Sequence, residues 1–164
     1  MLILLEMKEA MEHLVPQVYN MEKDKFYMEI AKLAASKSKD PKTKVGSCIV
    51  NNDRLLSIGY NGAPRGFPDE DIPKDSDEFL PANKNSYMIH SEVNAVLNYG
   101  GPLKDLQNAT LYVTISPCHE CAKVIIQTGI KRVVYLEEYH KSEVWHMAKV
   151  LFQLGKVKYE KYSD

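Results

Sequence analysis

The chain has 164 residues, the length of one globular domain with a sizeable core, so a repeat array or a second catalytic domain is not expected. Its 21 basic and 22 acidic side chains give a formal net charge of −1, and 45% of the residues are hydrophobic. This balance excludes a disordered chain and argues against a dedicated nucleic-acid-binding protein. The three cysteines cannot pair completely, and the short spacing of Cys118 and Cys121 favours a metal or redox site over a disulfide framework.

The N-terminal sequence predicts a short amphipathic helix that ends at Pro16. An apolar run at residues 2–5 ends at Glu6, far short of the roughly 7–15 residues of a signal-peptide core or the roughly 20 of a membrane span. We therefore expect a cytoplasmic protein that does not contact a membrane. Apolar residues then alternate at spacings of three and four, at Leu4, Met7, Met11 and Leu14. Such a face could pack on the body of the protein or on another subunit, so we treat residues 1–20 as a helical appendage and residues 21–164 as the single main domain.

Hydrophobic periodicity from residue 22 onward predicts a helix, a hairpin and a long loop. The helix spans residues 22–37, ends at Asp40-Pro41 and is expected to bury one apolar face, made of Phe26, Ile30, Leu33 and Ala34. The hairpin strands, residues 45–50 and 55–60, flank a turn at Asn51-Asn52-Asp53. Residues 61–83 contain four prolines and many acidic residues without either period, which predicts a long surface loop whose acidic side chains are solvated.

The second half of the chain alternates helices and strands. The predicted order is a helix at 89–99, a strand at 110–115, a helix at 118–128, a strand at 132–136, a helix at 142–154 and a strand at 157–162. Val93, Val96 and Leu97 are expected to face inward from the first of these helices. Because helical crossovers join parallel strands, this order predicts an α/β protein with three layers, α-β-α, around one mixed five-stranded sheet.

Two short motifs at predicted helix starts carry the chemistry. His90-Ser91-Glu92 opens one helix, and Pro117-Cys118-His119-Glu120-Cys121 opens another. The pattern H-x-E followed by P-C-x-x-C is a signature of zinc-dependent nucleobase deaminases. Cys118 and Cys121 share one helix face, and a helix N-terminus favours the thiolate that binds metal, so both can hold one ion with His90 as the third ligand. The fourth position is left to water, and Glu92 is expected to move protons and not to bind the metal.

Other interpretations of the same residues are kept open. A structural zinc site would need Cys48 as a fourth ligand, but Cys48 lies in an apolar strand where a buried, inert thiol is favoured. A redox pair of cysteines would need neither His90 nor Glu92. His119 should point away from the metal, and a surface or hydrogen-bonded role is expected of the histidines without ligand spacing, His13, His140 and His146.

Beyond the zinc motifs, the chain resembles the deoxycytidylate deaminases from about Phe26 to Tyr162. The segments that carry the resemblance are Ser38-Lys39-Asp40-Pro41, Gly59-Tyr60-Asn61-Gly62 with Pro64-Arg65-Gly66, His90 to Ala95, Ser116 to Ile126 and Gly129-Ile130-Lys131. Ser91 stands where that family usually has alanine, and the backbone contact expected there survives the change. The resemblance implies a cytidine-deaminase-like fold, one catalytic zinc ion, and hydrolysis of dCMP to dUMP and ammonia, which feeds thymidylate synthesis.

The resemblance also implies a role for individual residues. A zinc-bound hydroxide attacks C4 of cytosine, while Glu92 protonates N3 and then the departing amine. By position, Asn61 contacts the sugar or base, Ser116 lines the base pocket and Tyr139 reaches the 5′-phosphate. An ordinary surface role is the competing interpretation for Tyr139. The nearby cations considered for the phosphate are Arg65 and Lys141.

Oligomerisation and regulation are further implications of the resemblance. It implies a homo-oligomer, with a hexamer favoured, that dCTP with Mg²⁺ activates and dTTP inhibits at a separate site to which residues 59–66 contribute. Unregulated relatives exist as well, and one sequence shows neither a second site nor a second state. The competing functions are a deaminase of adenosine in transfer RNA or of another polynucleotide, and a non-catalytic zinc-binding module. The near-zero net charge favours a free nucleotide over a nucleic-acid polymer, and a binding module has no need of Glu92.

Overall fold

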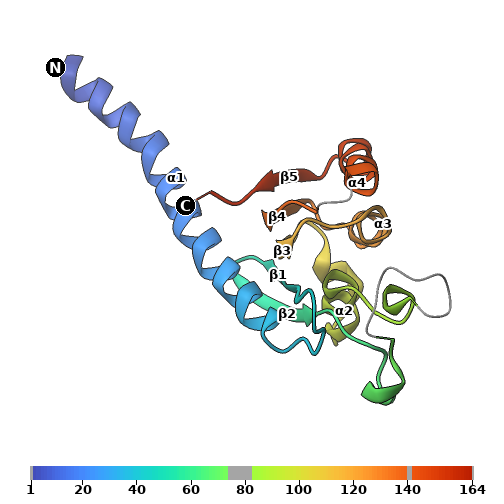
Figure 1. Cartoon of the computed structure of the whole chain (residues 1–164). Helices are drawn as coiled ribbons and strands as arrows, with labels where there is room; N and C mark the ends of the chain where they lie inside the picture. Colours follow the sequence, from blue (N-terminus) through green and yellow to red (C-terminus); the bar gives the residue numbers. More distant parts are fainter. Residues whose placement is uncertain (1, 74–82, 140–141, 164) are drawn as a thin grey trace.

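The computed structural model describes residues 2–73, 83–139 and 142–163. Its centre is one five-stranded sheet in the order β2-β1-β3-β4-β5 (Figure 1). The strands are β1 (Gly46–Asn51), β2 (Arg54–Tyr60), β3 (Thr110–Ile115), β4 (Arg132–Glu137) and β5 (Lys158–Lys161). β1 pairs antiparallel with β2 and with β3, whereas β3, β4 and β5 run parallel to one another. The predicted mixed sheet and its N-terminal hairpin are therefore confirmed.

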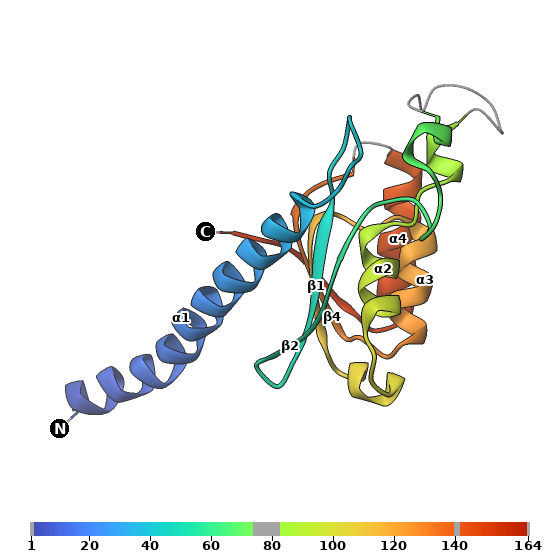
Figure 2. The same ribbon diagram turned by 90° about the horizontal axis from the view of Figure 1, so that it is seen from below.

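Helices cover both faces of the sheet, which gives the predicted three layers (Figure 2). One face carries α1 (Leu2–Ala35), and the other carries α2 (Ser91–Asn98), α3 (His119–Gln127) and α4 (Ser142–Leu154). Because successive side chains of a strand point to opposite faces, β4 contributes to both layers. Val133 packs with Ile125 of α3 and Phe152 of α4, whereas Val134 packs with Met28 of α1. Short 3-10 turns that periodicity did not predict lie in the connections, at η1 (Asp69–Asp71), η2 (Lys84–Ser86) and η3 (Leu103–Leu106).

Helix α1 approaches β1 so closely that only glycine fits beneath it. A Cβ added at Gly46 would collide with the backbone of Ala31 and Ala35, and both alanines are buried. The predicted buried face of this helix was therefore wrong in part. Phe26 and Leu33 are 62% and 71% exposed, because bulky side chains do not fit between a helix and a strand whose backbones touch.

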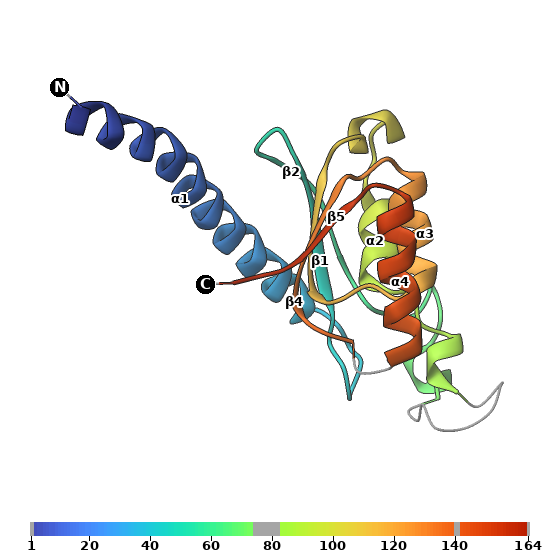
Figure 3. The same cartoon turned by 90° about the horizontal axis from the view of Figure 1, so that it is seen from above.

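Two further sequence predictions on the helices are wrong. Helix α1 does not end at Pro16 but runs on as one helix of 34 residues, whose N-terminal part extends away from the sheet (Figures 1, 2 and 3). Proline costs about 3 kcal/mol inside a helix, yet the backbone on both sides of Pro16 is helical. On α2, Leu97 does not face inward, since its side chain is 65% exposed. Among the described residues, no helix is both long and apolar enough to cross a membrane.

The predicted loop after β2 is described for residues 61–73 and for residue 83. Gly62 forms an antiparallel bridge with Ile89, with N···O distances of 3.1 and 2.8 Å. The loop is thereby tied to the residue just before His90. Glu70 and Asp71 are exposed, as expected for solvated acids, whereas the acidic residues at 75, 77 and 78 lie outside the described residues.

The close approach of α1 to β1 can be tested with an alanine substitution. Gly46→Ala is expected to lower the free energy of unfolding by about 1–3 kcal/mol or more, because the added methyl group forces the helix off the strand. Urea unfolding followed by circular dichroism measures the change. Gly100→Ala is the matched control, since nothing lies within 4 Å of a Cβ added there. An equal loss in both variants would show that the close approach is not the cause.

Candidate metal centre and active site

Two helix N-termini supply all three predicted metal ligands. His90 is the N-cap residue of α2, and Cys118 is the N-cap residue of α3. Cys121 follows in the first turn of α3, where its backbone N–H donates to Sγ of Cys118 at 3.5 Å. Since α2 and α3 lie side by side on the same face of the sheet (Figure 2), the three side chains meet between the two helix starts.

The position of α2 is set by backbone contact with the hairpin. A Cβ added at Gly59 of β2 would collide with the backbone of Ser91 and Ala95. Two buried hydroxyl groups hold the same helix: Ser47 Oγ donates to the carbonyl of Ser91 at 2.8 Å, and Ser57 Oγ donates to that of Ala95 at 2.7 Å. The start of α2 is therefore anchored to β1 and β2, directly after His90.

The three ligand atoms have the spacing that one zinc ion requires. Nδ1 of His90 is 3.3 Å from Sγ of Cys121 and 3.5 Å from Sγ of Cys118. All three donor atoms lie within 4.8 Å of one another. Zinc bonds of about 2.0–2.3 Å in a tetrahedron place neighbouring ligand atoms roughly 3.5 Å apart. One imidazole and two thiols thus fit zinc, with the fourth position left for water or substrate, as in catalytic sites.

Local charges favour metal binding at this cluster. A hydrogen bond with Cys121, together with the neighbouring His90, lowers the pKa of Cys118 to about 4, so this thiol is a thiolate at neutral pH. The N-terminus of α3 adds positive potential that acts in the same direction. The hydrogen bond with Cys118 raises the pKa of His90 to about 9. A metal ion that binds here therefore displaces a proton from His90.

Glu92 brings a buried carboxyl group to the edge of the metal cluster. It lies in the first turn of α2, its side chain is 4% exposed, and burial raises its pKa. Glu92 follows the ligand His90 by two residues, and the charge of His90 opposes this rise in pKa whereas the charge of Cys118 adds to it. A carboxyl group held in this way can both accept and return a proton beside a metal-activated water.

Cys48 does not belong to the metal cluster. It packs against Tyr27 and Val134 on the side of the sheet that faces α1, whereas Cys118 and Cys121 lie on the other side. Its side chain is fully buried, and burial raises the pKa of its thiol to about 12. The predicted burial of this thiol is confirmed, and its position on the other side of the sheet excludes a structural zinc site with Cys48 as fourth ligand.

The remaining histidines that the structure describes lie apart from the metal cluster. Nε2 of His119 is 3.1 Å from the carboxylate of Glu120, and His146 is exposed on α4, as predicted for both. The side chain of His13 and all of His140 lie outside the described residues.

Two of the residues inferred for the substrate lie against each other, next to the ligand Cys118. The backbone N–H of Tyr139 donates to Oγ of Ser116 at 2.7 Å, and Ser116 is 2% exposed. Burial raises the pKa of Tyr139, so its hydroxyl group remains a hydrogen-bond donor at neutral pH. Lys141, the other cation considered for the phosphate, lies outside the described residues.

The other two inferred substrate residues already have protein partners. Oδ1 of Asn61 accepts the backbone N–H of Val45 at 2.8 Å, and its Nδ2 donates to the carbonyl of Thr43 at 2.8 Å. Asn61 therefore braces the loop before β1. The guanidinium of Arg65 donates to Oδ1 of Asn98 at 3.0 Å, at the opposite end of α2 from Glu92. The structure thus brings Ser116 and Tyr139 together, but Arg65 binds Asn98, which lies about 9 Å along the helix from Glu92.

Sequence reasoning missed a hydrogen bond to Glu92 and a buried ion pair. The hydroxyl group of Ser91 donates to Oε2 of Glu92 at 2.9 Å, where the sequence marked Ser91 only as a difference from the family pattern. Lys84 and Asp40 form an ion pair with N···O distances of 2.6 and 2.7 Å, and both side chains are buried. A lysine in a polar, proline-rich stretch predicts exposure, and only the contact across 44 residues of sequence explains its burial.

Comparisons with known proteins agree with this geometry. The family model for the cytidine and deoxycytidylate deaminase zinc-binding region matches residues 21–137. Deoxycytidylate deaminase of Mus musculus is 40% identical over 141 residues, which cover 84% of this chain and 78% of that protein. The enzyme of the same name from Enterobacteria phage T2 is 34% identical over 151 residues, covering 71% and 80% of the two chains.

A solved structure provides a further comparison. The crystal structure of dCMP deaminase from the cyanophage S-TIM5, in complex with dCMP and dUMP, superimposes with a TM-score of 0.71 at 31% identity, covering 85% of this chain and 96% of that one. The region matched by the family model contains His90, Cys118 and Cys121, the residues that the structure brings together. This chain therefore belongs to the cytidine and deoxycytidylate deaminase family.

Proposed function

We propose that the protein catalyses the zinc-dependent hydrolytic deamination of dCMP to dUMP and ammonia. The observation that carries this proposal is the buried carboxyl group of Glu92 beside the His90, Cys118 and Cys121 cluster. A zinc site with a purely structural role has no use for a buried carboxyl group, which costs free energy to place there. The substrate is supported by relatives of 40% and 34% identity that are named deoxycytidylate deaminases.

Glu92 carries the proton transfers of the proposed reaction. When bound by the three ligands, zinc lowers the pKa of the water that replaces the amino group of cytosine. The Glu92 carboxylate takes up the two protons of this water in turn. It passes the first to N3 and the second to the departing amino group, which leaves as ammonia while the water oxygen stays on C4. Burial raises the pKa of Glu92, which suits a group that must hold a proton between two transfers. The hydrogen bond from Ser91 holds Oε2, which restricts how the carboxyl group can turn.

The substrate contacts are proposed from position in the family. Ser116 lines the base pocket, Asn61 contacts the sugar or base, and Tyr139 donates its hydroxyl group to the 5′-phosphate. The contact between Ser116 and the backbone of Tyr139 supports a single pocket wall built from the ends of β3 and β4. Arg65 is the proposed second phosphate contact, and it must leave Asn98 to reach it.

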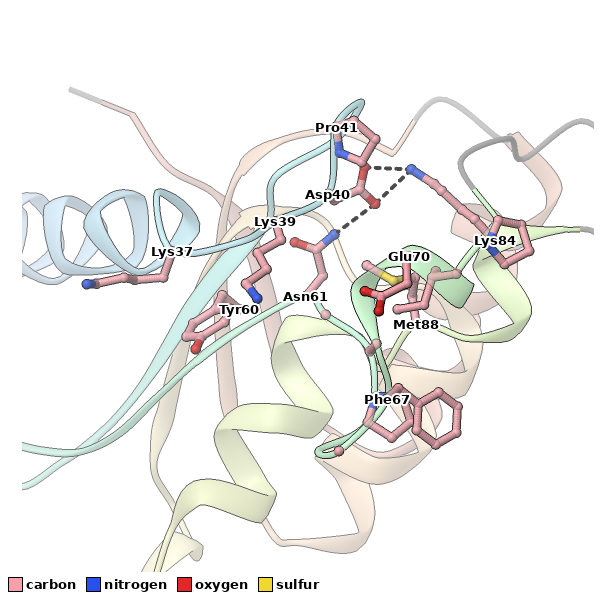
Figure 4. Close-up of a pocket in the computed structure, with 16 residues that line it drawn as sticks. Lys37, Lys39, Asp40, Pro41, Tyr60, Asn61, Phe67, Glu70, Lys84 and Met88 are labelled. Carbon is pink, nitrogen blue, oxygen red and sulfur yellow. Dashed lines mark hydrogen bonds and ion pairs between the residues drawn. The ribbon is translucent and has the colours of Figure 1, made fainter.

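A cavity beside the site is the proposed effector site for dCTP with Mg²⁺ and for dTTP. It measures about 680 Å³ and is shown in Figure 4. Lys39 and Tyr60 line one side, and the apolar Phe67 and Met88 line the other, an arrangement suited to phosphates and to a base. Glu70 offers a carboxylate oxygen of the kind that Mg²⁺ binds together with phosphates. Through Gly62, which also lines the cavity, an effector would act on the segment that leads into His90.

The remaining proposals concern organisation and location. Residues 21–164 form the catalytic domain, which agrees with the start of the family match at residue 21, and residues 1–20 form an appendage. The functional unit is a homo-oligomer, with a hexamer favoured. The cytoplasm is the proposed location, because the three cysteines, Cys48, Cys118 and Cys121, are free thiols and two of them are metal ligands that a reducing compartment protects.

The first prediction concerns metal binding. Cys118→Ala and Cys121→Ala are each expected to lose zinc, because removing one of three protein ligands leaves too few bonds to hold the ion. Metal analysis of the purified variants by mass spectrometry measures the zinc content. Cys48→Ala removes an equally buried thiol from the other side of the sheet and should retain zinc. Loss of zinc from the Cys48 variant would contradict the assigned ligand set.

The second prediction concerns proton transfer. Glu92→Gln keeps the shape of the side chain but cannot carry a proton, so kcat should fall about 10²–10⁴-fold while zinc remains bound. Ammonia release gives the rate, and metal analysis together with thermal unfolding checks the site and the fold. Near-normal turnover in a zinc-loaded Glu92→Gln protein would refute the proposed mechanism.

The third prediction concerns the substrate. The purified protein is incubated with cytidine, deoxycytidine, CMP, dCMP or dCTP, with and without dCTP or dTTP as effector, and ammonia release is followed. We expect dCMP to have the highest kcat/KM, since the 5′-phosphate provides charged contacts that a nucleoside lacks. A preference for deoxycytidine over dCMP would rule out the nucleotide assignment.

Tyr139→Phe should raise KM for dCMP but leave KM for deoxycytidine unchanged.

A further inference from the structure

The sequence of the N-terminal part of α1 contains an apolar stripe, and the side chains of the stripe that the structure describes are exposed. Its members alternate at spacings of three and four residues, and we call them the α1 seam: Leu4, Met7, Met11, Leu14, Val18 and Met21. Met11, Leu14 and Met21 are 60%, 58% and 53% exposed. All three views show this part of α1 extending away from the sheet and the other helices (Figures 1, 2 and 3). Of the two roles that the sequence left open for this face, packing on the body is therefore excluded for Met11, Leu14 and Met21.

The spacing indicates the kind of surface that fits the α1 seam. Alternation of three and four is the a/d pattern of a heptad repeat, which produces the narrow stripe used when one helix packs along another. Pro16 occupies position f of this heptad, the position farthest from the seam. Lys25 takes the next a position and ends the seam, just before the buried residues Tyr27 and Met28 begin the contact with the sheet.

A partner along the α1 seam would stabilise the N-terminal part of this helix. Most helical stability in proteins comes from packing of an apolar face and not from intrinsic propensity. Among the described side chains of this part of α1, Tyr19 donates its hydroxyl group to Asp53 at the hairpin turn, at 3.1 Å. The seam extends over about 26 Å of helix, so the stabilising contact has to run along it.

We propose that the α1 seam pairs antiparallel with the α1 seam of a second copy of this chain. Charge complementarity supports both the partner and the direction. Lys8 and Glu22 occupy e positions, seven residues before and after Val15. In an antiparallel pair e positions face e positions, so Lys8 of each copy meets Glu22 of the other. A parallel pair would instead set Val15 and Glu22 against the uncharged g residues Ala10 and Gln17, which gives no opposite-charge contact.

The proposal is independent of the reaction. Met21 is the first residue matched by the family model, so the other five members of the seam lie outside the matched region. The seam covers only two and a half heptads, which is short for a free-standing coiled coil, so the pairing should depend on protein concentration. Its failure would leave the proposed deamination untouched.

The first test removes the apolar contact. The full-length, zinc-loaded protein is compared with Leu14→Asp by sedimentation equilibrium over a wide range of concentrations. At concentrations where the parent protein is fully associated, Leu14→Asp should have roughly half its molar mass, since a buried aspartate is not tolerated in the seam. Deamination per bound zinc reports that the catalytic domain has folded. An unchanged molar mass in a folded Leu14→Asp protein would overturn the proposal.

The second test examines the direction of pairing through its charges. Glu22→Lys should weaken self-association about tenfold, because two opposite-charge contacts become like-charge contacts. Glu12→Lys makes the same change at an exposed b position away from the seam and should have little effect. The double variant Lys8→Glu with Glu22→Lys should recover the affinity of the parent. If Glu22→Lys has no more effect than Glu12→Lys, or if the double variant fails to recover, the antiparallel pairing is wrong.

Discussion

The rest of the site depends on the backbone contact between α2 and the N-terminal hairpin. Gly59 leaves no room for a side chain beneath Ser91 and Ala95, and the hydroxyl groups of Ser47 and Ser57 bind the carbonyls of the same two residues. A helix held in this way at two successive turns cannot slide along the sheet. The N-cap residue, His90, is therefore held in a single position. A shift of α2 by one residue would move both the His90 ligand and the Glu92 carboxyl group out of the cluster.

This anchoring explains why the metal ligands can come from two distant segments. Cys118 and Cys121 lie on α3, which follows the central strand β3, and β3 pairs directly with β1. Both helices are thus positioned by adjacent strands of the same sheet. The distances of 3.3 and 3.5 Å between ligand atoms follow from this common attachment. The N-terminus of α3 then favours the thiolate of Cys118, and the buried carboxyl group of Glu92 follows His90 in the first turn of α2.

How well the sequence predicts this structure depends on whether a feature is local. The strand 110–115 and the helix 142–154 are found with the predicted bounds, because their periodicity is strong and turn residues delimit them. The ligand set was also predictable, since each of the two segments that supply it, His90 to Glu92 and Cys118 to Cys121, is a short local motif. The buried face of α1 was not, because it depends on Gly46, a residue beyond the end of the helix that decides which side chains can approach the sheet.

Features that join distant segments were missed for the same reason. The ion pair of Lys84 with Asp40 spans 44 residues and places two charges in the interior, where each is tolerated only because of the other. Burial alone would raise the pKa of Asp40, but Lys84 and the backbone N–H groups of Thr43 and Lys42 outweigh burial and lower it. No pattern of hydrophobic residues encodes such a pair.

The contacts around this ion pair indicate a structural role for Asn61, whereas the sequence alone suggested a contact with the substrate. Both ends of its amide are used by the backbone at Thr43 and Val45, and its Nδ2 is also 3.5 Å from Asp40. The side chain therefore fixes the loop after β2, to which Asn61 belongs, relative to the loop before β1. Because Gly62 is bridged to the residue before His90, the same chain of contacts runs from the buried Lys84 to the metal ligand. A direct contact of Asn61 with a nucleotide must use the hydrogen-bonding capacity that remains, so its role in orienting the loops comes first and any role in recognition is added to it.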